Sequence, residues 1–198
     1  MPDKQAWFVP IKNECQRMPD TSTAVEPPVI DLGDLGNGVP VCITERIGGA
    51  MAEAAAVCFD FNGHLQNVIM RVSGSFDQTY RMRWSAVTQA QKAGWKDMPY
   101  TIEQGAYGVG ILLIRGLTGH TIIERAYKTT GFDYWLGDDG DMFQRKARLE
   151  VSGTGDPNLV NARVARKKRQ TTPTDHTGLP AYIVVVDFKT PQSWVERK

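Results

Sequence analysis

The stretch GFDYWLGDDGDMFQRKARLEVS, residues 131–152, has the pattern of a β-hairpin and decides the predicted fold. Its second half alternates between an apolar set, Ala147, Leu149 and Val151, and a polar set, Lys146, Arg148, Glu150 and Ser152. Side chains of a strand point to opposite faces with a period of two. This arm is therefore expected to pack one face into a core and to present a charged row on the other.

The first arm of the hairpin carries Asp133, and the polar segment 137–141 between the arms is a turn signal. If the chain folds back about Asp141 and Met142, Asp133 lies across from Glu150. Opposed residues on antiparallel strands have Cβ atoms roughly 4.5 to 5.5 Å apart. Two carboxylates are then expected to meet on one face of the sheet, which is the beginning of a metal site.

The segment before the hairpin predicts a buried helix followed by a strand. Residues 101–117 have apolar side chains around most of the helical circumference, with Thr101 as the expected N-cap and Gly119 as the stop. Residues 120–127 have the composition of a strand that leads into the hairpin.

The segment after the hairpin predicts a helix and a second buried strand. Asp156-Pro157 has the form of a helix start, and Lys167 lies just beyond an apolar seam in the helix expected to run to Thr171. The run 181–188, AYIVVVDF, indicates a strand covered on both faces and parallel to the strand before the helix. We therefore expect a mixed α/β fold.

The chain divides by composition into three regions. Prolines and glycines recur in residues 1–40, which predicts an extended arm, and residues 41–98 are expected to form a β-rich accessory region before the core at 99–198. Within the accessory region strands are predicted at 55–61, 65–72 and 79–85, with Asn62-Gly63 as a hairpin turn. The preceding GGAMAEAAA is either a short helix, which its composition favours, or the start of the first strand. Residues 189–198 are expected to be a polar tail.

Length and composition fit a soluble chain with one main core. The chain has 198 residues, of which 41% are hydrophobic, and no apolar run approaches the roughly 18 residues of a membrane span. The three cysteines, Cys15, Cys42 and Cys58, match neither a disulfide framework nor a zinc site. A cytoplasmic protein that does not contact membranes is expected.

The net charge of +1 conceals a basic cluster in the helix predicted after the hairpin. Its members are Arg163, Arg166, Lys167, Lys168 and Arg169. Such a cluster is able to contact nucleic-acid phosphates, and a solvated helix face explains it equally well.

From residue 101 onward the predicted order is helix, strand, strand, strand, helix, strand, with an acid in the second and third strands. Over residues 101–188 this order resembles the core of the PD-(D/E)xK nuclease superfamily, which includes restriction endonucleases and Holliday junction resolvases. The resemblance implies a restriction-endonuclease-like αβββαβ core with an N-terminal β-rich extension. Asp133 would match the superfamily's aspartate, Glu150 the acid of its Glu-x-Lys tripeptide, and Glu103 a glutamate that some members place in the first helix. With the backbone carbonyl of Val151, these acids would hold Mg²⁺ or Mn²⁺.

The tripeptide here is Glu150-Val151-Ser152, with serine where the superfamily has lysine. The cation needed to stabilise developing charge would come instead from Lys146 or Arg148 on the same strand face, or from Lys167 on the following helix. Ser152 would hold the attacking water. In the competing interpretation, the two acids are ordinary cross-strand partners of arginine or lysine on a solvated sheet face.

The resemblance implies a metal-dependent endonuclease that hydrolyses phosphodiester bonds. DNA is expected as the substrate in preference to RNA. A homodimer or larger assembly is expected as the form that cuts two strands. The alternative is a catalytically inactive nuclease-fold protein that binds nucleic acid or a partner protein in a larger assembly. Cleavage in the presence of Mg²⁺ or Mn²⁺ distinguishes the two.

Overall fold

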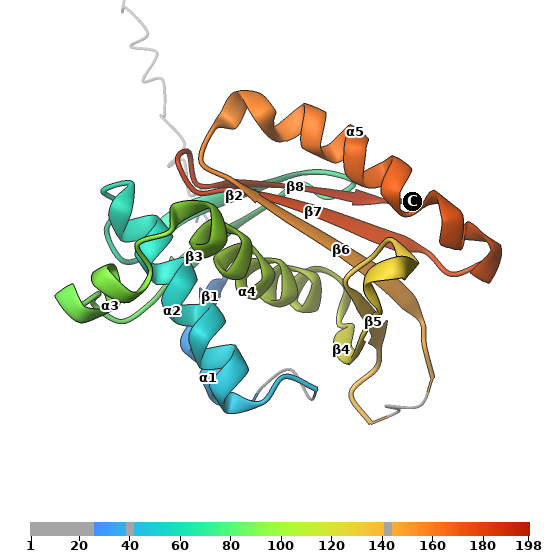
Figure 1. Ribbon diagram of the computed structural model, residues 1–198, viewed down its shortest axis with the longest axis horizontal. Coiled ribbons are helices and arrows are strands. Elements are labelled where there is room, and N and C mark those ends of the chain that lie inside the picture. The colour runs from blue at the N-terminus through green and yellow to red at the C-terminus, as the bar shows by residue number, and fades with distance from the viewer. Residues whose placement is uncertain (1–25, 39–41, 141–143) are drawn as a thin grey trace, which may run out of the picture.

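The computed structural model describes residues 26–38, 42–140 and 144–198, and Figure 1 shows the chain. Its strands are β1 (Val29–Asp31), β2 (Val68–Gly74), β3 (Gln78–Arg83), β4 (Thr121–Arg125), β5 (Tyr134–Gly137), β6 (Ala147–Thr154), β7 (Ala181–Asp187) and β8 (Gln192–Arg197). Its α-helices are α1 (Gly33–Gly36), α2 (Glu45–Phe61), α3 (Gln89–Gly94), α4 (Met98–Thr118) and α5 (Val160–Gln170). Shorter 3₁₀ turns are η1 (Lys128–Thr130), η2 (Pro157–Leu159) and η3 (Thr172–Thr177).

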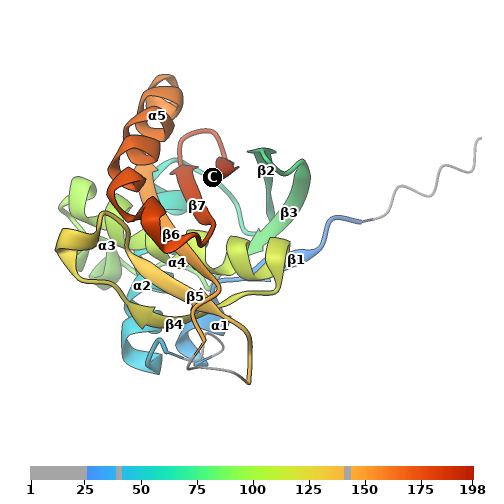
Figure 2. The same ribbon diagram turned by 90° about the vertical axis from the view of Figure 1, so that its right-hand side faces the viewer.

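All strands join one eight-stranded mixed sheet in the order β1-β3-β2-β8-β7-β6-β5-β4. Helix α5 covers one face of β6 and β7, while α4 covers the other face and α2 packs against α4 (Figures 1 and 2). A large apolar cluster lies under α2 and α4, and a smaller one, built on Val160, Val164, Ile183 and Val185, lies under α5. None of the helices in the described ranges is both long and apolar enough to cross a bilayer.

The predicted mixed α/β character and the order of elements from α4 to β7 are confirmed. Strands β4, β5 and β6 are antiparallel neighbours, and β7 returns parallel to β6 after α5. The β5–β6 register pairs Tyr134 with Leu149 and Trp135 with Arg148. Asp133 lies one residue before this ladder and does not continue its register, because its N–H donates to the carbonyl of Leu149, the residue already paired with Tyr134. The turn itself, predicted at Asp141 and Met142, is outside the described residues.

Helix α4 begins earlier than its apolar pattern indicates. It starts at Met98 with Asp97 in the N-cap position, so the prediction of Thr101 as N-cap is wrong. Thr101 is buried in the first turn, where its hydroxyl donates to the carbonyls of Trp95 and Asp97 at 2.9 and 2.8 Å. The predicted stop at Gly119 is confirmed, since this residue adopts the left-handed conformation with φ of 76°.

The strand predicted at 55–61 is wrong, because these residues form the second half of α2. The Thr44 side chain caps this helix by accepting a hydrogen bond from Ile47 N–H, and the favoured helical interpretation of GGAMAEAAA is confirmed. The preference of these residues for a strand is overridden by helix packing, because the small residues of α2 let α4 approach closely. Asn62-Gly63 ends α2 and is not a hairpin turn; Asn62 occupies the C-cap and Gly63 has φ of 75°.

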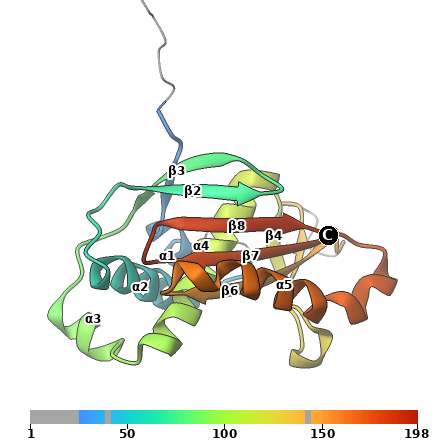
Figure 3. The same cartoon turned by 90° about the horizontal axis from the view of Figure 1, so that it is seen from above.

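Residues 189–198 are not a tail, because they include β8. This strand pairs antiparallel with β7 and parallel with β2, and thus connects the β2–β3 hairpin to the sheet, as Figure 3 shows. Ser193 and Val195 are buried, whereas the alternating residues Gln192, Trp194 and Glu196 are partly exposed. The polar composition reflects this one-sided burial, and the β-branched and apolar content is too low to signal a strand.

Of the predicted arm at 1–40, the described residues 26–38 contribute β1, which pairs parallel with β3, and α1. Residues 1–25 and 39–41 are outside the described ranges, and so is Cys15. Cys42 and Cys58 are free thiols, the first exposed and the second buried.

Close packing of α4 on β6 leads to a prediction about stability. A Cβ added at Gly153 would lie 2.6 Å from the Ile102 carbonyl oxygen and 2.8 Å from the Ala106 Cβ. Gly153→Ala should therefore lower the free energy of unfolding by about 1–3 kcal/mol, as measured by chemical denaturation. Gly94→Ala, where a Cβ meets nothing within 4 Å, is the matched control. Equal stability of the two variants would contradict this packing.

Candidate functional site

Asp133 lies immediately before β5, where the chain is already aligned with β6. Its N–H donates to the Leu149 carbonyl at 2.8 Å. Its carboxylate accepts two hydrogen bonds, one from the Tyr107 hydroxyl to Oδ1 at 3.0 Å and one from the Val151 N–H to Oδ2 at 2.8 Å. Asp133 is thus fixed from both α4 and β6.

Glu150, on β6, is 1% exposed. Its Oε1 accepts hydrogen bonds from Lys167 Nζ and, at 2.9 Å, from Gln170 Nε2, both on α5. Its Oε2 is buried and has no hydrogen-bond partner within the described part of the chain. Burial first, and then the negative charge of Asp133, raise the pKa of Glu150 from its ordinary 4.5 to about 8, against the lowering effect of Lys167. The charges of the two acids therefore influence each other. The predicted meeting on one sheet face is not what the contacts show, because Asp133 is held by Tyr107 of α4 and Glu150 by Lys167 and Gln170 of α5, on the other face.

The polar face of β6 is not a solvated charged row. Arg148 is 2% exposed, and Ser152 is buried with Glu150 beneath α5 and η3. The interpretation of the acids as ordinary cross-strand partners on an exposed sheet face is therefore wrong. Charges removed from water in this way are costly unless each is paired, and both Glu150 and Arg148 do have ionic partners, Lys167 and Asp175.

Only one of the three predicted replacement cations contacts Glu150. The Arg148 guanidinium is held by Thr174 Oγ1 and the Leu179 carbonyl, each at 2.7 Å. Lys146 lies 3.8 Å from Asp138 on the far side of the hairpin. Lys167 alone reaches the site, because Val160 and Val164 anchor α5 on the sheet and orient the following turn toward Glu150. The predictions for Arg148 and Lys146 are therefore corrected.

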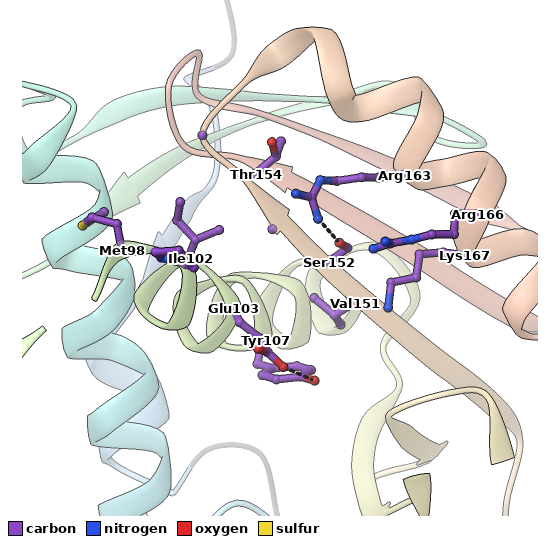
Figure 4. Close-up of a pocket in the computed structure, with 13 residues that line it drawn as sticks. Met98, Ile102, Glu103, Tyr107, Val151, Ser152, Thr154, Arg163, Arg166 and Lys167 are labelled. Carbon is purple, nitrogen blue, oxygen red and sulfur yellow. Dashed lines mark hydrogen bonds between the residues drawn. The ribbon is translucent and has the colours of Figure 1, made fainter. Parts of the chain in front are cut away.

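A cleft of about 580 Å³ opens beside these residues, between the first turns of α4, the end of β6 and α5. Figure 4 shows its two unlike walls. Met98 and Ile102 make the α4 wall apolar near the start of the helix, whereas Arg163, Arg166 and Lys167 extend from α5. The cleft therefore has one apolar and one cationic side.

Ser152 and Glu103 both lie in this cleft. The Ser152 hydroxyl accepts a hydrogen bond from Arg163 Nη1 at 3.3 Å, and Glu103 projects from the α4 side next to Tyr107 (Figure 4). The Tyr107 hydroxyl lies 3.4 Å from Glu103 Oε1 as well as 3.0 Å from Asp133. Glu103 is thus connected to the acid pair through Tyr107.

The basic cluster is divided by its positions on α5. Arg163, Arg166 and Lys167 line the cleft. Lys168 instead pairs with Glu196 of β8 at 2.7 Å, and Arg169 is exposed outside the cleft lining. Three of the five predicted nucleic-acid-binding residues are therefore brought together, and two are not.

Sequence reasoning missed Tyr107 and Gln170, and it named Arg125 only, with Arg148 and Lys146, as a cross-strand partner of the two acids on a solvated sheet face. Tyr107 follows Glu103 by four residues and Gln170 follows Lys167 by three, so helical spacing placed both on the faces already singled out. Arg125 of β4 lies over the rings of Tyr107 and Tyr134, at 5.1 and 5.0 Å from their centroids, and no local sequence pattern connects these residues. This contact buttresses Tyr107, which holds Asp133.

The donor set suits a hard divalent cation. Within the described ranges no group of three or more His, Cys, Asp and Glu side chains is close enough to hold a metal ion. The charge of Asp133 nevertheless acts on Glu150, whose buried Oε2 has no hydrogen-bond partner among the described residues. Mg²⁺ commonly binds through one or two carboxylates and keeps several waters, so the pair fits such an ion.

The pH dependence of stability tests the buried state of Glu150. A folded-state pKa of about 8, above the ordinary 4.5, means that the folded protein holds a proton that the unfolded chain releases. Stability should therefore fall as pH rises from about 5 to 8, by at most roughly 1.4 kcal/mol per pH unit. Glu150→Gln should remove this contribution in denaturation curves recorded across that range. Parallel pH profiles for the two proteins would show that Glu150 is not protonated in the folded state.

The chain was compared with protein-family models, curated proteins and solved structures, and it matches none of them.

Proposed function

We propose that the protein is a metal-dependent nuclease that hydrolyses phosphodiester bonds, with DNA as its substrate. The observation that carries the proposal is the cationic cleft with Lys167 bound to the buried Glu150, whose pKa the charge of Asp133 raises. The order α4-β4-β5-β6-α5-β7, with β6 and β7 parallel, supports a restriction-endonuclease-like core. Because proteins with the same order of elements often differ in function, the proposal depends on the residues of the site and not on the fold.

In this proposal Asp133 and Glu150 hold Mg²⁺ or Mn²⁺, with the Val151 carbonyl and Glu103 as further oxygen donors. Such an ion would polarise the phosphoryl oxygen and lower the pKa of a bound water. Tyr107 and the Val151 N–H orient Asp133. Lys167 supplies the cation that the tripeptide lacks, and Arg163 positions the phosphate next to Ser152.

The alternative is an inactive nuclease-fold protein that binds nucleic acid. The direct pairing of Lys167 with Glu150 favours it, because this contact satisfies both charges without an ion. A cleavage assay distinguishes the nuclease from the inactive binding protein. The first predicts cleavage of plasmid or single-stranded DNA with Mg²⁺ or Mn²⁺ and none with EDTA, whereas the alternative predicts metal-independent binding without cleavage.

Arg163 and Arg166 should contribute to binding through phosphate contacts. Arg163→Ala/Arg166→Ala should reduce DNA affinity and lower the slope of log affinity against log salt by about 1–2 units, because each phosphate contact contributes roughly one unit. Lys168→Ala/Arg169→Ala removes the same charge outside the cleft and is the matched control. Fluorescence anisotropy at several salt concentrations measures both. An equal change in the two double variants would mean that α5 attracts DNA only by its net charge.

A further inference from the structure

A second hollow, of about 360 Å³, lies next to the catalytic cleft at the start of α4. Its lining includes Phe61 at the end of α2, Trp95 and Lys96 between α3 and α4, and Met98. Met98 also lines the catalytic cleft, so the two concavities adjoin along one side chain. The volume is at the small end of the roughly 300–1,000 Å³ range of ligand pockets, which suits one planar group.

One aromatic residue of this hollow is exposed to solvent, and the other is fixed in position by the protein before any ligand binds. Phe61 is 68% exposed although it is apolar. The Trp95 indole N–H donates to Glu53 at 2.7 Å, and the ring stacks on Tyr100 with centroids 5.9 Å apart. A fixed ring beside an exposed ring loses little conformational entropy when a ligand stacks on it.

The charge of the hollow favours an anion. Lys92 is neutralised by Asp60 at 2.6 Å, while Lys96 is exposed and has no ionic partner within the described ranges. Aromatic side chains that stack on bases, next to cations that contact the backbone, are what proteins use to bind single-stranded nucleic acid. In a duplex the bases are stacked inside and do not reach such a hollow unless they leave the helix.

We propose that this hollow binds an unpaired base next to the phosphate in the catalytic cleft. The preferred substrate is then single-stranded nucleic acid or a duplex with an unpaired end. The strand crosses the start of α4 from the Arg163–Arg166 wall, past Met98, to Phe61 and Trp95. The inference rests on the proposed function for the phosphate in the cleft, although binding in the hollow needs no cleavage.

The test is the affinity of Phe61→Ala/Lys96→Ala for a fluorescein-labelled oligothymidylate of about twelve nucleotides, measured by anisotropy in EDTA, with a duplex of equal length beside it. Single-strand affinity should fall about tenfold, while duplex affinity changes less than about twofold. Arg46→Ala/Ile47→Ala, which removes one charge and one exposed apolar side chain at the other end of α2, is the matched control and should bind as the unaltered protein does. Phe61→Trp keeps a stacking ring and should retain the affinity.

Unchanged single-strand affinity in Phe61→Ala/Lys96→Ala would overturn the inference. An equal loss for duplex, or an equal loss in the control variant, would overturn it too. Because EDTA prevents metal-dependent cleavage, the two proposals fail separately. Selective loss of single-strand binding without any cleavage by the unaltered protein would retain the hollow and reject the nuclease. Metal-dependent cleavage by the unaltered protein, with unchanged single-strand binding in the hollow variants, would retain the nuclease and reject the hollow as a base-binding site.

Discussion

Asp133→Asn should abolish metal-dependent cleavage, with a loss of at least about 10³-fold, while the fold remains intact. Asparagine has the same shape, and its amide can satisfy both present contacts: the carbonyl oxygen accepts from the Val151 N–H, and the NH₂ donates to the Tyr107 oxygen. The lost negative charge removes one of the two carboxylates from the ion. Metal stabilisation of a phosphoryl transition state is worth several kcal/mol, and each 1.4 kcal/mol corresponds to tenfold in rate.

The measurement is the single-turnover cleavage rate with Mn²⁺, together with the thermal unfolding temperature. Asp138→Asn is the matched control, because Asp138 is an exposed acid on the same hairpin that pairs with His120 and Lys146. It should cleave at the unaltered rate. Substantial cleavage by Asp133→Asn would remove this aspartate from the mechanism, and a large drop in its unfolding temperature would assign it a structural role.

Lys167→Met should reduce the cleavage rate about 10²–10³-fold while Mn²⁺ affinity is retained or increased. A cation that acts on charge developing in the transition state contributes to the rate and little to ground-state metal binding. Removal of Lys167 also frees Glu150 Oε1 from its ion pair, so no positive charge competes with the metal for this carboxylate. Methionine replaces the stem of lysine and preserves its packing over β6.

Lys168→Met is the neighbouring control, since Lys168 points instead to Glu196 on β8. Rates and Mn²⁺ affinities of both variants should be compared by single-turnover assays and titration calorimetry. Parallel losses of rate and metal affinity in Lys167→Met would mean that the lysine maintains the site without acting on the reaction. Full activity of Lys167→Met would mean that Arg163 or Arg166, which line the same cleft, supplies the cation instead.

The hairpin and the elements around it are predictable from sequence because their signals are local and strong. The alternation of residues 147–152 sets the two faces of β6, and the hairpin pattern correctly predicts that β5 pairs antiparallel with β6. What alternation does not tell is how the polar face is covered. That face is buried by α5 and η3, and only the tertiary structure shows that Arg148 is engaged while Lys167 remains beside Glu150.

The sequence predictions that are wrong concern elements whose structure depends on contacts between residues distant in the sequence. Residues 55–61 have strand-like composition but lie in α2, which packs so closely on α4 that a Cβ at Gly105 would lie 2.9 Å from the Ala55 backbone. This packing joins segments far apart in the chain, so it leaves no local signal. Strand β8 is stabilised on both sides by neighbours distant in sequence. Likewise, Tyr107 joins the site through Asp133, 26 residues away, and its role depends on a contact that no local pattern reports.

The most direct measurement is the anomalous difference density of Mn²⁺ in crystals soaked with this ion. We expect a peak between the carboxylates of Asp133 and Glu150, within the roughly 2.0–2.6 Å coordination distances of hard cations from oxygen. The buried Glu150 Oε2, which accepts no hydrogen bond from the residues that the structure describes, should be one of the ligands. A peak at this position would support the account. Fully occupied Mn²⁺ elsewhere, with Asp133 and Glu150 free of density and Lys167 still bound to Glu150, would contradict it.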